Sequence, residues 1–258
     1  VYKPTDSDSE QDALNGEYHY IDKPLIYSDD VRNGALNTRL RFMCESLSPD
    51  FINSGARRVS PYSSTGGYSY SFLDGFCKNF ELSQSTGMLV RSSDEVKTIP
   101  RGEEINFVDD YDIIVTLPPV PFTGTYEIRL FMNTLAGNDV DSDRGVIQIY
   151  FGEDDNYPTK KENLHPCGIP IDMTIAVQDP RIGGILDEDL REEGGEEAII
   201  ANDKAMRNRG YMKGMAFYAA QGKSLNSRDD EGCMRKILTT EYIEDDKTYK
   251  LRIRLVGG

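Results

Sequence analysis

Apolar and polar residues alternate along several segments of this chain, and this alternation indicates its fold. The segment 247–256, KTYKLRIRLV, places Tyr, Leu, Ile and Leu at alternate positions with Lys or Arg between them. The segments 37–46, 111–120 and 125–133 alternate in a similar way. Because successive side chains point to opposite faces of a strand, each segment predicts a strand with one buried face, as in antiparallel sheets. Shorter strands are predicted at 18–27, 68–73, 77–83, 87–91, 145–151 and 169–175.

Turn-forming strings such as STGG, LDG, PPVPFTG and GEDDNYP separate these strands. About ten short strands at this spacing predict an all-β fold, a jelly-roll-like antiparallel β-sandwich. Helical patterning is weak: only 202–208 predicts a short helix, with Asn202 or Asp203 as its N-cap. The stretch 179–227 lacks strand periodicity and is predicted to form a long irregular flap.

The bulk composition bounds the domain organisation. The chain has 258 residues, 38% of them hydrophobic and 28% charged, as in an ordinary soluble protein. This length holds one large domain or two small ones. We predict that residues 1–16 form an acidic linker or the end of a preceding domain, and that residues 17–258 form the sandwich. No apolar run approaches the ~20 residues that a membrane-spanning helix needs, so no transmembrane segment is predicted.

The net charge of the chain limits which classes of molecule it is expected to bind. The chain carries 44 acidic and 29 basic residues, for a formal charge of −15. Such a charge repels polyphosphate, so no nucleic-acid partner is expected without a segregated basic face. The one sizeable basic cluster lies within 202–213 and closely follows the acidic run 187–197, which neutralises much of it.

This basic cluster predicts a structural clasp. Arg207 and Arg209 are expected to be at least partly buried and to pair with acids of the preceding run or with exposed loop carbonyls. Tyr211 is expected to pack onto the sandwich, with Gly210 and Gly214 letting the backbone turn sharply on either side. A ligand site at the same arginines is the alternative, and the residues alone leave it open.

Known catalytic motifs are absent from the sequence. There is no nucleophile elbow, zinc-protease helix motif, phosphate loop or dinucleotide fingerprint. The four cysteines are widely scattered, which argues against a zinc framework and favours buried thiols. His19 and His165 are interpreted as satisfied polar groups. No cofactor is therefore expected, although a carboxylate pair for glycoside hydrolysis stays open because sequence does not reveal separations of ~5–9 Å.

One acidic loop resembles a calcium loop in part. The string GNDVDSDRG places Asp139, Asp141 and Asp143 at alternate positions. Arg144 occupies the position of the loop glycine, and no Glu closes the loop at its twelfth position. We expect a solvated acidic hairpin loop here, and no metal site.

A Gly- and Ser-rich stretch, 56–72, is the candidate binding loop. It carries Arg57, Arg58, Tyr62, Tyr68 and Tyr70, whose side chains can stack on and hydrogen-bond a sugar or a partner protein. The alternative is that Tyr68 and Tyr70 simply pack within a strand. The chain has no Trp, which weakens the case for a glycan platform.

Several strings together resemble one family. DIIVTLPPVPFTGTYEIRL, RGVIQIYF, PCGIPIDM, DPRIG, DKAMRNRGYMKG and KTYKLRIRL occur in this order. In this combination the chain resembles the C-terminal domain of fasciclin-type surface lipoproteins from Bacteroidetes, over roughly 18–256. LNGEYHYIDKPLIY also resembles the closing strands of a fasciclin domain, at 17–28. The helical first half of such a domain would precede Val1.

The resemblance implies a location and partners. It implies a secreted protein tethered by a lipid to the outer membrane and facing outwards, with the lipid-bearing Cys outside this sequence. Its partners would be a TonB-dependent transporter and the lid lipoprotein of that transporter. The function expected is a non-catalytic cell-surface domain that binds a partner protein or an extracellular polymer in an uptake or adhesion assembly. A stand-alone glycan-binding module and a polysaccharide hydrolase are the alternatives.

Overall fold

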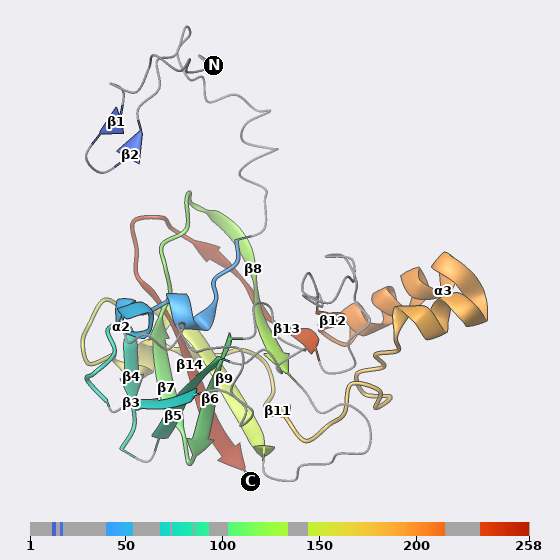
Figure 1. Cartoon of the computed structure of the whole chain (residues 1–258), viewed down its shortest axis with the longest axis horizontal. Coiled ribbons are helices and arrows are strands. Elements are labelled where there is room, and N and C mark those ends of the chain that lie inside the picture. Colours follow the sequence, from blue (N-terminus) through green and yellow to red (C-terminus); the bar gives the residue numbers. More distant parts are fainter. Residues whose placement is uncertain are drawn as a thin grey trace, which may run out of the picture. The chain divides into compact units, whose positions relative to one another are not determined.

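The structure is a computed structural model that describes residues 12–13, 16–17, 40–53, 68–72, 74–84, 86–92, 103–133, 144–214 and 233–257. The chain divides into two compact units, 1–41 and 42–258. In the first unit, β1 (Asp12–Ala13) and β2 (Gly16–Glu17) form an antiparallel pair. The second unit contains the sheets shown in Figure 1.

The largest sheet of the second unit has six strands. Its order is β10-β9-β14-β7-β4, with β11 beside β9, and all neighbours are antiparallel. The strands are β4 (Phe80–Leu82), β7 (Asp112–Thr116), β9 (Val146–Glu153), β10 (His165–Pro166), β11 (Ile171–Asp172) and β14 (Tyr249–Gly257).

Two three-stranded antiparallel sheets accompany it. One has the order β3-β5-β6 and the other β12-β13-β8. Their strands are β3 (Tyr68–Phe72), β5 (Thr86–Ser92), β6 (Glu103–Asp109), β8 (Gly124–Asn133), β12 (Tyr211–Lys213) and β13 (Cys233–Ile243).

Both small sheets pack on the same face of the six-stranded sheet. Ile113, Ile253 and Ile149 lie opposite one another on β7, β14 and β9, so they share that face. Ile113 belongs to a core cluster with Met88 of β5, whereas Ile149 and Ile253 cluster with Leu238 of β13. The predicted all-β, sandwich-like antiparallel fold is therefore confirmed, while the jelly-roll topology stays a prediction.

The predicted flap, 179–227, is wrong where the structure describes it, because most of that part is helix α3 (Asp187–Asn208). The helix begins after Leu186 rather than at the predicted N-cap, Asn202 or Asp203. Asp and Glu fill its first turn and favour the helix dipole, but few apolar residues mark a buried stripe. The sequence therefore did not predict this helix, because its mostly polar residues show no apolar stripe. Two shorter elements, α2 (Pro49–Asn53) and the 3-10 helix η3 (Cys44–Ser46), precede the sheets.

Some of the predicted strands are present in the structure, one is wrong in its described part, and the long strand β13 was not predicted. The predicted strands at 68–73, 87–91, 111–120, 125–133, 145–151 and 247–256 correspond to strands of the structure. The prediction at 37–46 is wrong in its described part, because 40–43 is not strand and Leu40 and Phe42 are 43% and 49% exposed. The eleven-residue β13 escaped prediction. A register shift between Ile237 and Thr239 moves its inward-facing positions from even to odd numbers and breaks the period of two.

No helix in the described part of the chain is long and apolar enough to cross a membrane.

Candidate functional site

A buried lysine lies on the outer face of the six-stranded sheet. Lys250 of β14 is 3% exposed, although Tyr249 and Leu251 on either side pack into the core between the sheets. Its Nζ donates to Asn156 O at 2.5 Å, to Thr159 Oγ1 at 2.5 Å and to Glu81 Oε1 at 3.2 Å. An ammonium has three N–H donors, so all three are satisfied.

The segment 154–164, here called the strap, covers this lysine. A Cβ added to Gly152 of β9 would lie 2.3 Å from Asn163 O, so the strap backbone rests directly on the sheet. Asp154 Oδ1 lies 3.9 Å from Lys250 Nζ, and its carboxylate accepts from Asn156 N and Asn163 Nδ2, each at 2.7 Å. Burial would raise the pKa of Asp154, but these hydrogen bonds and the charge of Lys250 hold the pKa below its ordinary value.

A second ionic cluster lies on the same outer face. Arg252 Nε and Nη2 each donate to the Asp112 carboxylate at 2.7 Å, and Lys161 Nζ donates to it at 3.0 Å. The Arg252 guanidinium also lies 4.9 Å from the centroid of the Tyr150 ring. Burial would raise the pKa of Asp112, but the hydrogen bonds from Arg252 and Lys161 lower it. Together the two clusters contain three cations and three carboxylates, so their formal charges cancel only when both clusters are counted.

In the region of the predicted clasp the buried cation is a lysine rather than an arginine, and the clasp role of Arg207 and Arg209 stays a prediction. Arg207 is 49% exposed and pairs with Glu127 of β8 at 2.8 Å, and Arg209 is exposed. Arg207 is therefore half-exposed and paired, but its described acid lies on β8 and not in the run 187–197. Lys213 makes that contact instead: its Nζ lies 2.7 Å from Asp187 Oδ1, with side chains 6% and 10% exposed.

The kink in α3 explains how this contact forms. The backbone leaves helical geometry at Gly194 and Gly195, the latter with a φ of 67°. The two halves of the helix therefore differ in direction, and Asp187 can return to Lys213 beyond the other end of the helix. Tyr211 does pack against a core cluster, and Lys236 Nζ lies 3.9 Å from the centroid of its ring. A Gly-Gly pair inside a charged run was the sequence signal for this arrangement.

Most residues of the predicted binding loop and calcium loop lie outside the described residues. These are Arg57, Arg58, Tyr62, Asp139, Asp141 and Asp143. Tyr68 and Tyr70 lie on β3, opposite Ser92 and Val90 of β5. Among the described residues, no group of three or more His, Cys, Asp or Glu side chains is placed to hold a metal ion.

The next residues to compare with the sequence predictions are three cysteines and His165. Cys77 and Cys167 are buried thiols, as predicted, and burial raises their pKa values to about 12 and about 11. Cys44 is exposed, so the expectation of burial is wrong for it. His165 Nε2 lies 3.2 Å from Glu241 Oε1, which agrees with a satisfied polar group.

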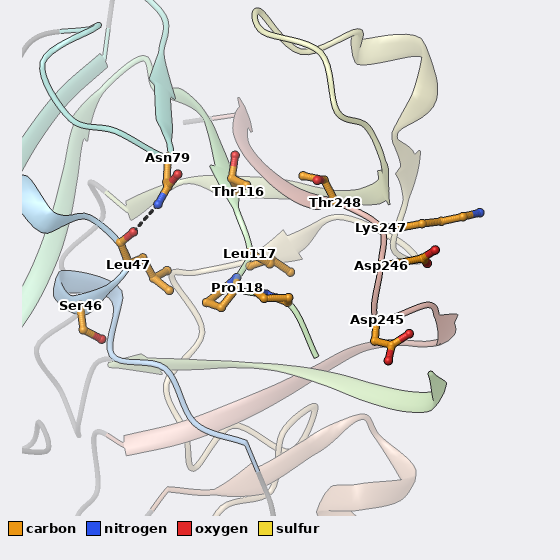
Figure 2. A pocket seen from close by; sticks show the side chains of 11 residues that line it. Ser46, Leu47, Asn79, Thr116, Leu117, Pro118, Asp245, Asp246, Lys247 and Thr248 are labelled. Atoms are coloured by element: carbon orange, nitrogen blue, oxygen red, sulfur yellow. Dashed lines mark hydrogen bonds between the residues drawn. The ribbon is translucent and has the colours of Figure 1, made fainter. Parts of the chain in front are cut away.

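The structure contains a hollow of about 470 Å³ that sequence reasoning did not find. Figure 2 shows Leu117 and Pro118 at its centre, with η3 on one side and the turn between β13 and β14 on the other. Thr116 N donates to Asn79 O at 2.9 Å, and Asn79 Nδ2 donates to Leu47 O at 2.8 Å. The lining comprises Ser46, Leu47, Asn79, Thr116, Leu117, Pro118, Pro119, Asp245, Asp246, Lys247 and Thr248.

The charge that the hollow offers is negative. Asp245 Oδ1 accepts from Thr123 Oγ1 at 2.7 Å, which fixes one carboxylate. Lys247 points away from the hollow in Figure 2, and its Nζ pairs with Glu153 at 3.0 Å. Among the described residues, nothing hydrogen-bonds or ion-pairs with the Asp246 carboxylate. The sequence signal for this hollow was the string EDDK. It could not be recognised as a hairpin turn from the sequence, because the preceding strand β13 was not predicted.

Comparisons of the chain with protein-family models, with curated proteins and with solved structures find no match.

Proposed function

We propose that this protein is a non-catalytic binding module that takes a hydroxyl-rich polymer, such as an extracellular polysaccharide, in the hollow beside the β13–β14 turn. The observation that carries the proposal is Asp246, which belongs to the lining of the hollow and whose carboxylate has no partner among the described residues. A carboxylate is an acceptor only, and sugar hydroxyl groups are donors that suit it.

The rest of the lining supports the same class of ligand. The volume of about 470 Å³ lies within the range of ordinary ligand pockets. Leu117, Pro118 and Pro119 supply an apolar surface for the C–H face of a sugar ring, while Ser46 and Thr248 add hydroxyl groups at the sides. The described lining contains no aromatic ring, so we expect weak affinity for a single sugar and a need for several units of the polymer.

The arrangement of carboxylates favours binding over hydrolysis. A glycoside hydrolase places its two carboxyl groups on either side of the scissile bond. In the hollow, Asp245 and Asp246 are adjacent on one turn, and Asp245 is held by Thr123. We therefore propose no reaction at this site.

We further propose that the module acts at the cell surface, lipid-anchored in the outer membrane beside a TonB-dependent transporter and its lid lipoprotein. Support for this context is the resemblance of 112–130, 144–151 and 203–214 to fasciclin-type surface lipoproteins. Protease treatment of intact cells, followed by co-purification from the native membrane, tests it. Protection of the protein in intact cells, or co-purification without any transporter, would count against the context.

Affinity electrophoresis tests the binding proposal. The chain is run in native gels that contain soluble starch, xylan, pectin or mucin, and we expect at least one polymer to retard it. Asp246→Asn should weaken the retardation, because the amide keeps one acceptor oxygen but loses the charge that strengthens hydrogen bonds from hydroxyl groups. Asp189→Asn on the exposed side of α3 makes the same charge change away from the hollow and should leave retardation intact. Absence of retardation by every polymer, or equal loss in both variants, would reject the proposal.

A further inference from the structure

Among the described strands, β8 has one paired edge and one edge without a strand partner, here called the open edge. It is ten residues long and lies at the end of the β12-β13-β8 sheet, where β13 is its one partner among the described strands (Figure 1). Among the described residues, none forms a backbone hydrogen bond to its other edge. The open edge therefore presents backbone N–H and C=O groups that could receive another strand.

The pairing of β13 identifies the residues that present these groups. Ile237 N donates to Gly210 O at 2.9 Å, so the backbone groups of Ile237 point towards β12. Its partner on β8 is Arg129, whose own N–H and C=O must then point away from β13, towards the open edge. Because strand residues alternate, Thr125, Glu127 and Phe131 point the same way.

β8 lacks several features that protect edge strands, although its outward face carries Glu127 and Arg129. The strand reads GTYEIRLFMN, without Pro or Lys, and is rich in residues that favour strands. The register shift of this sheet adds its extra residue to β13 and leaves β8 regular. A long and regular edge is suited to strand addition.

We propose that the strand added to this edge is β8 of a second copy of the same chain, antiparallel and centred on Ile128. This register places Glu127 opposite Arg129 of the second copy, and Arg129 opposite its Glu127. It also places Thr125 opposite Phe131. On the core side, Tyr126 lies opposite Leu130, and both already pack against the core in one chain. The strand is therefore complementary to itself, as a two-fold interface requires.

Charge selects this register over its neighbours. A shift by two residues in one direction would place Glu127 opposite Glu127, and a shift in the other direction would place Arg129 opposite Arg129. Like charges directly opposite each other destabilise a strand pair. A shift by one residue would turn the core-side residues outwards. Within one chain, Glu127 already accepts from Arg129 at 2.5 Å and from Arg207 at 2.8 Å, so two cations share one anion and a second carboxylate is favourable beside them.

The product is a continuous six-stranded sheet across two copies, with β8 no longer at an edge. The formal charge of −15 on each chain opposes association. This repulsion is screened at about 150 mM salt, so the association is best measured there.

Sedimentation velocity of the full chain, from about 5 to about 500 μM, measures the association. We expect the weight-average mass to rise from 29.0 kDa towards twice that value. Arg129→Glu and Glu127→Arg should each remain monomeric at every concentration, because like charges then face each other. An equimolar mixture of these two variants should associate again, since each new charge faces its opposite. Arg254→Glu, on an exposed position of β14, is the matched control and should associate like the wild type.

The mixture keeps the proposal testable even if a single variant is less stable, because restored association requires both chains to be folded. Wild-type chain that stays at 29.0 kDa throughout would overturn the proposal. So would single variants that associate like the wild type, or a mixture that stays monomeric.

Discussion

Two strands with the same alternation of residues meet different surroundings in this protein. On β14, Lys250 and Arg252 face outwards and are 3% and 9% exposed. On β8, Glu127 and Arg129 also face outwards, but each side chain is 23% exposed. The strap, 154–164, covers the first face with its own carboxylate, amide and carbonyl groups, whereas Arg207 reaches the second face from an exposed position.

The difference teaches that burial of a charge depends on what covers its strand. Under the strap, water cannot replace a lost partner, so every ammonium and carboxylate needs its contacts. On the open face, water solvates whatever is left unpaired, and ion pairs contribute little. The two faces should therefore respond very differently to matched substitutions.

The largest effect is expected at Lys250. Lys250→Ala leaves the Glu81 and Asp154 carboxylates near each other under the strap without their cation, so we expect a loss of about 3–5 kcal/mol in the free energy of unfolding. Urea unfolding measures it. Arg254→Ala, on an exposed position of the same strand, should change stability by less than about 1 kcal/mol. Equal effects of the two substitutions would show that the strap does not seal this face.

The next largest effect is expected at Lys213, and Arg207 is the exposed cation with which it is compared. Lys213→Ala removes the buried ammonium from the Asp187 carboxylate and should destabilise the fold by about 3 kcal/mol. Arg207→Ala removes a half-exposed ion pair and should change stability by less than about 1 kcal/mol. Thermal and urea unfolding of both variants provide the measurement. A larger loss for Arg207→Ala would reverse the assignment of the buried pair.

A smaller effect tests the contact between strap and sheet. Gly152→Ala places a methyl group against Asn163 O, a backbone atom that cannot simply rotate away, and should cost about 2 kcal/mol. Among the described residues, the methyl group of Gly124→Ala at the start of β8 meets Tyr126 alone, at 3.9 Å, so this substitution should be neutral or slightly stabilising. The urea midpoints of the two variants make the comparison. A tolerated Gly152→Ala would mean that the strap can lift off the sheet.

The smallest effect is a pH dependence. The pKa of Asp112 is lower in the folded protein than its ordinary value of 3.8, so the unfolded chain binds the proton first as the pH falls. The ionised Asp112 therefore contributes its full share to the free energy of unfolding above pH 3.8. This contribution is lost as the pH falls through the pKa that Asp112 has in the folded protein. Asp112→Asn, which keeps an acceptor oxygen for Arg252, should be less stable by about 1 kcal/mol at neutral pH and should converge with the wild type in acid. Urea midpoints against pH test this, and a stability difference that does not shrink in acid would contradict it.

Local sequence was sufficient where one physical pattern acted alone. The strands β7, β8, β9 and β14 carry a regular period of two, and each was predicted because burial of one face is enough to impose it. The sequence could not indicate β13, because its register shift is defined only against β8. It also concealed α3, whose helix is held by charge and by a few buried contacts rather than by an apolar stripe.

Tertiary structure alone decided which charges are buried and where the hollow lies. Alternation in 247–256 determined that Lys250 and Arg252 share a face, but only the strap, a segment about ninety residues earlier in the chain, made that face an interior. The hollow likewise joins η3, the residues after β7 and the β13–β14 turn, none of which neighbours another in sequence. Solvent exposure and cavity shape depend on contacts between distant segments, whereas the period of a strand is a property of adjacent residues.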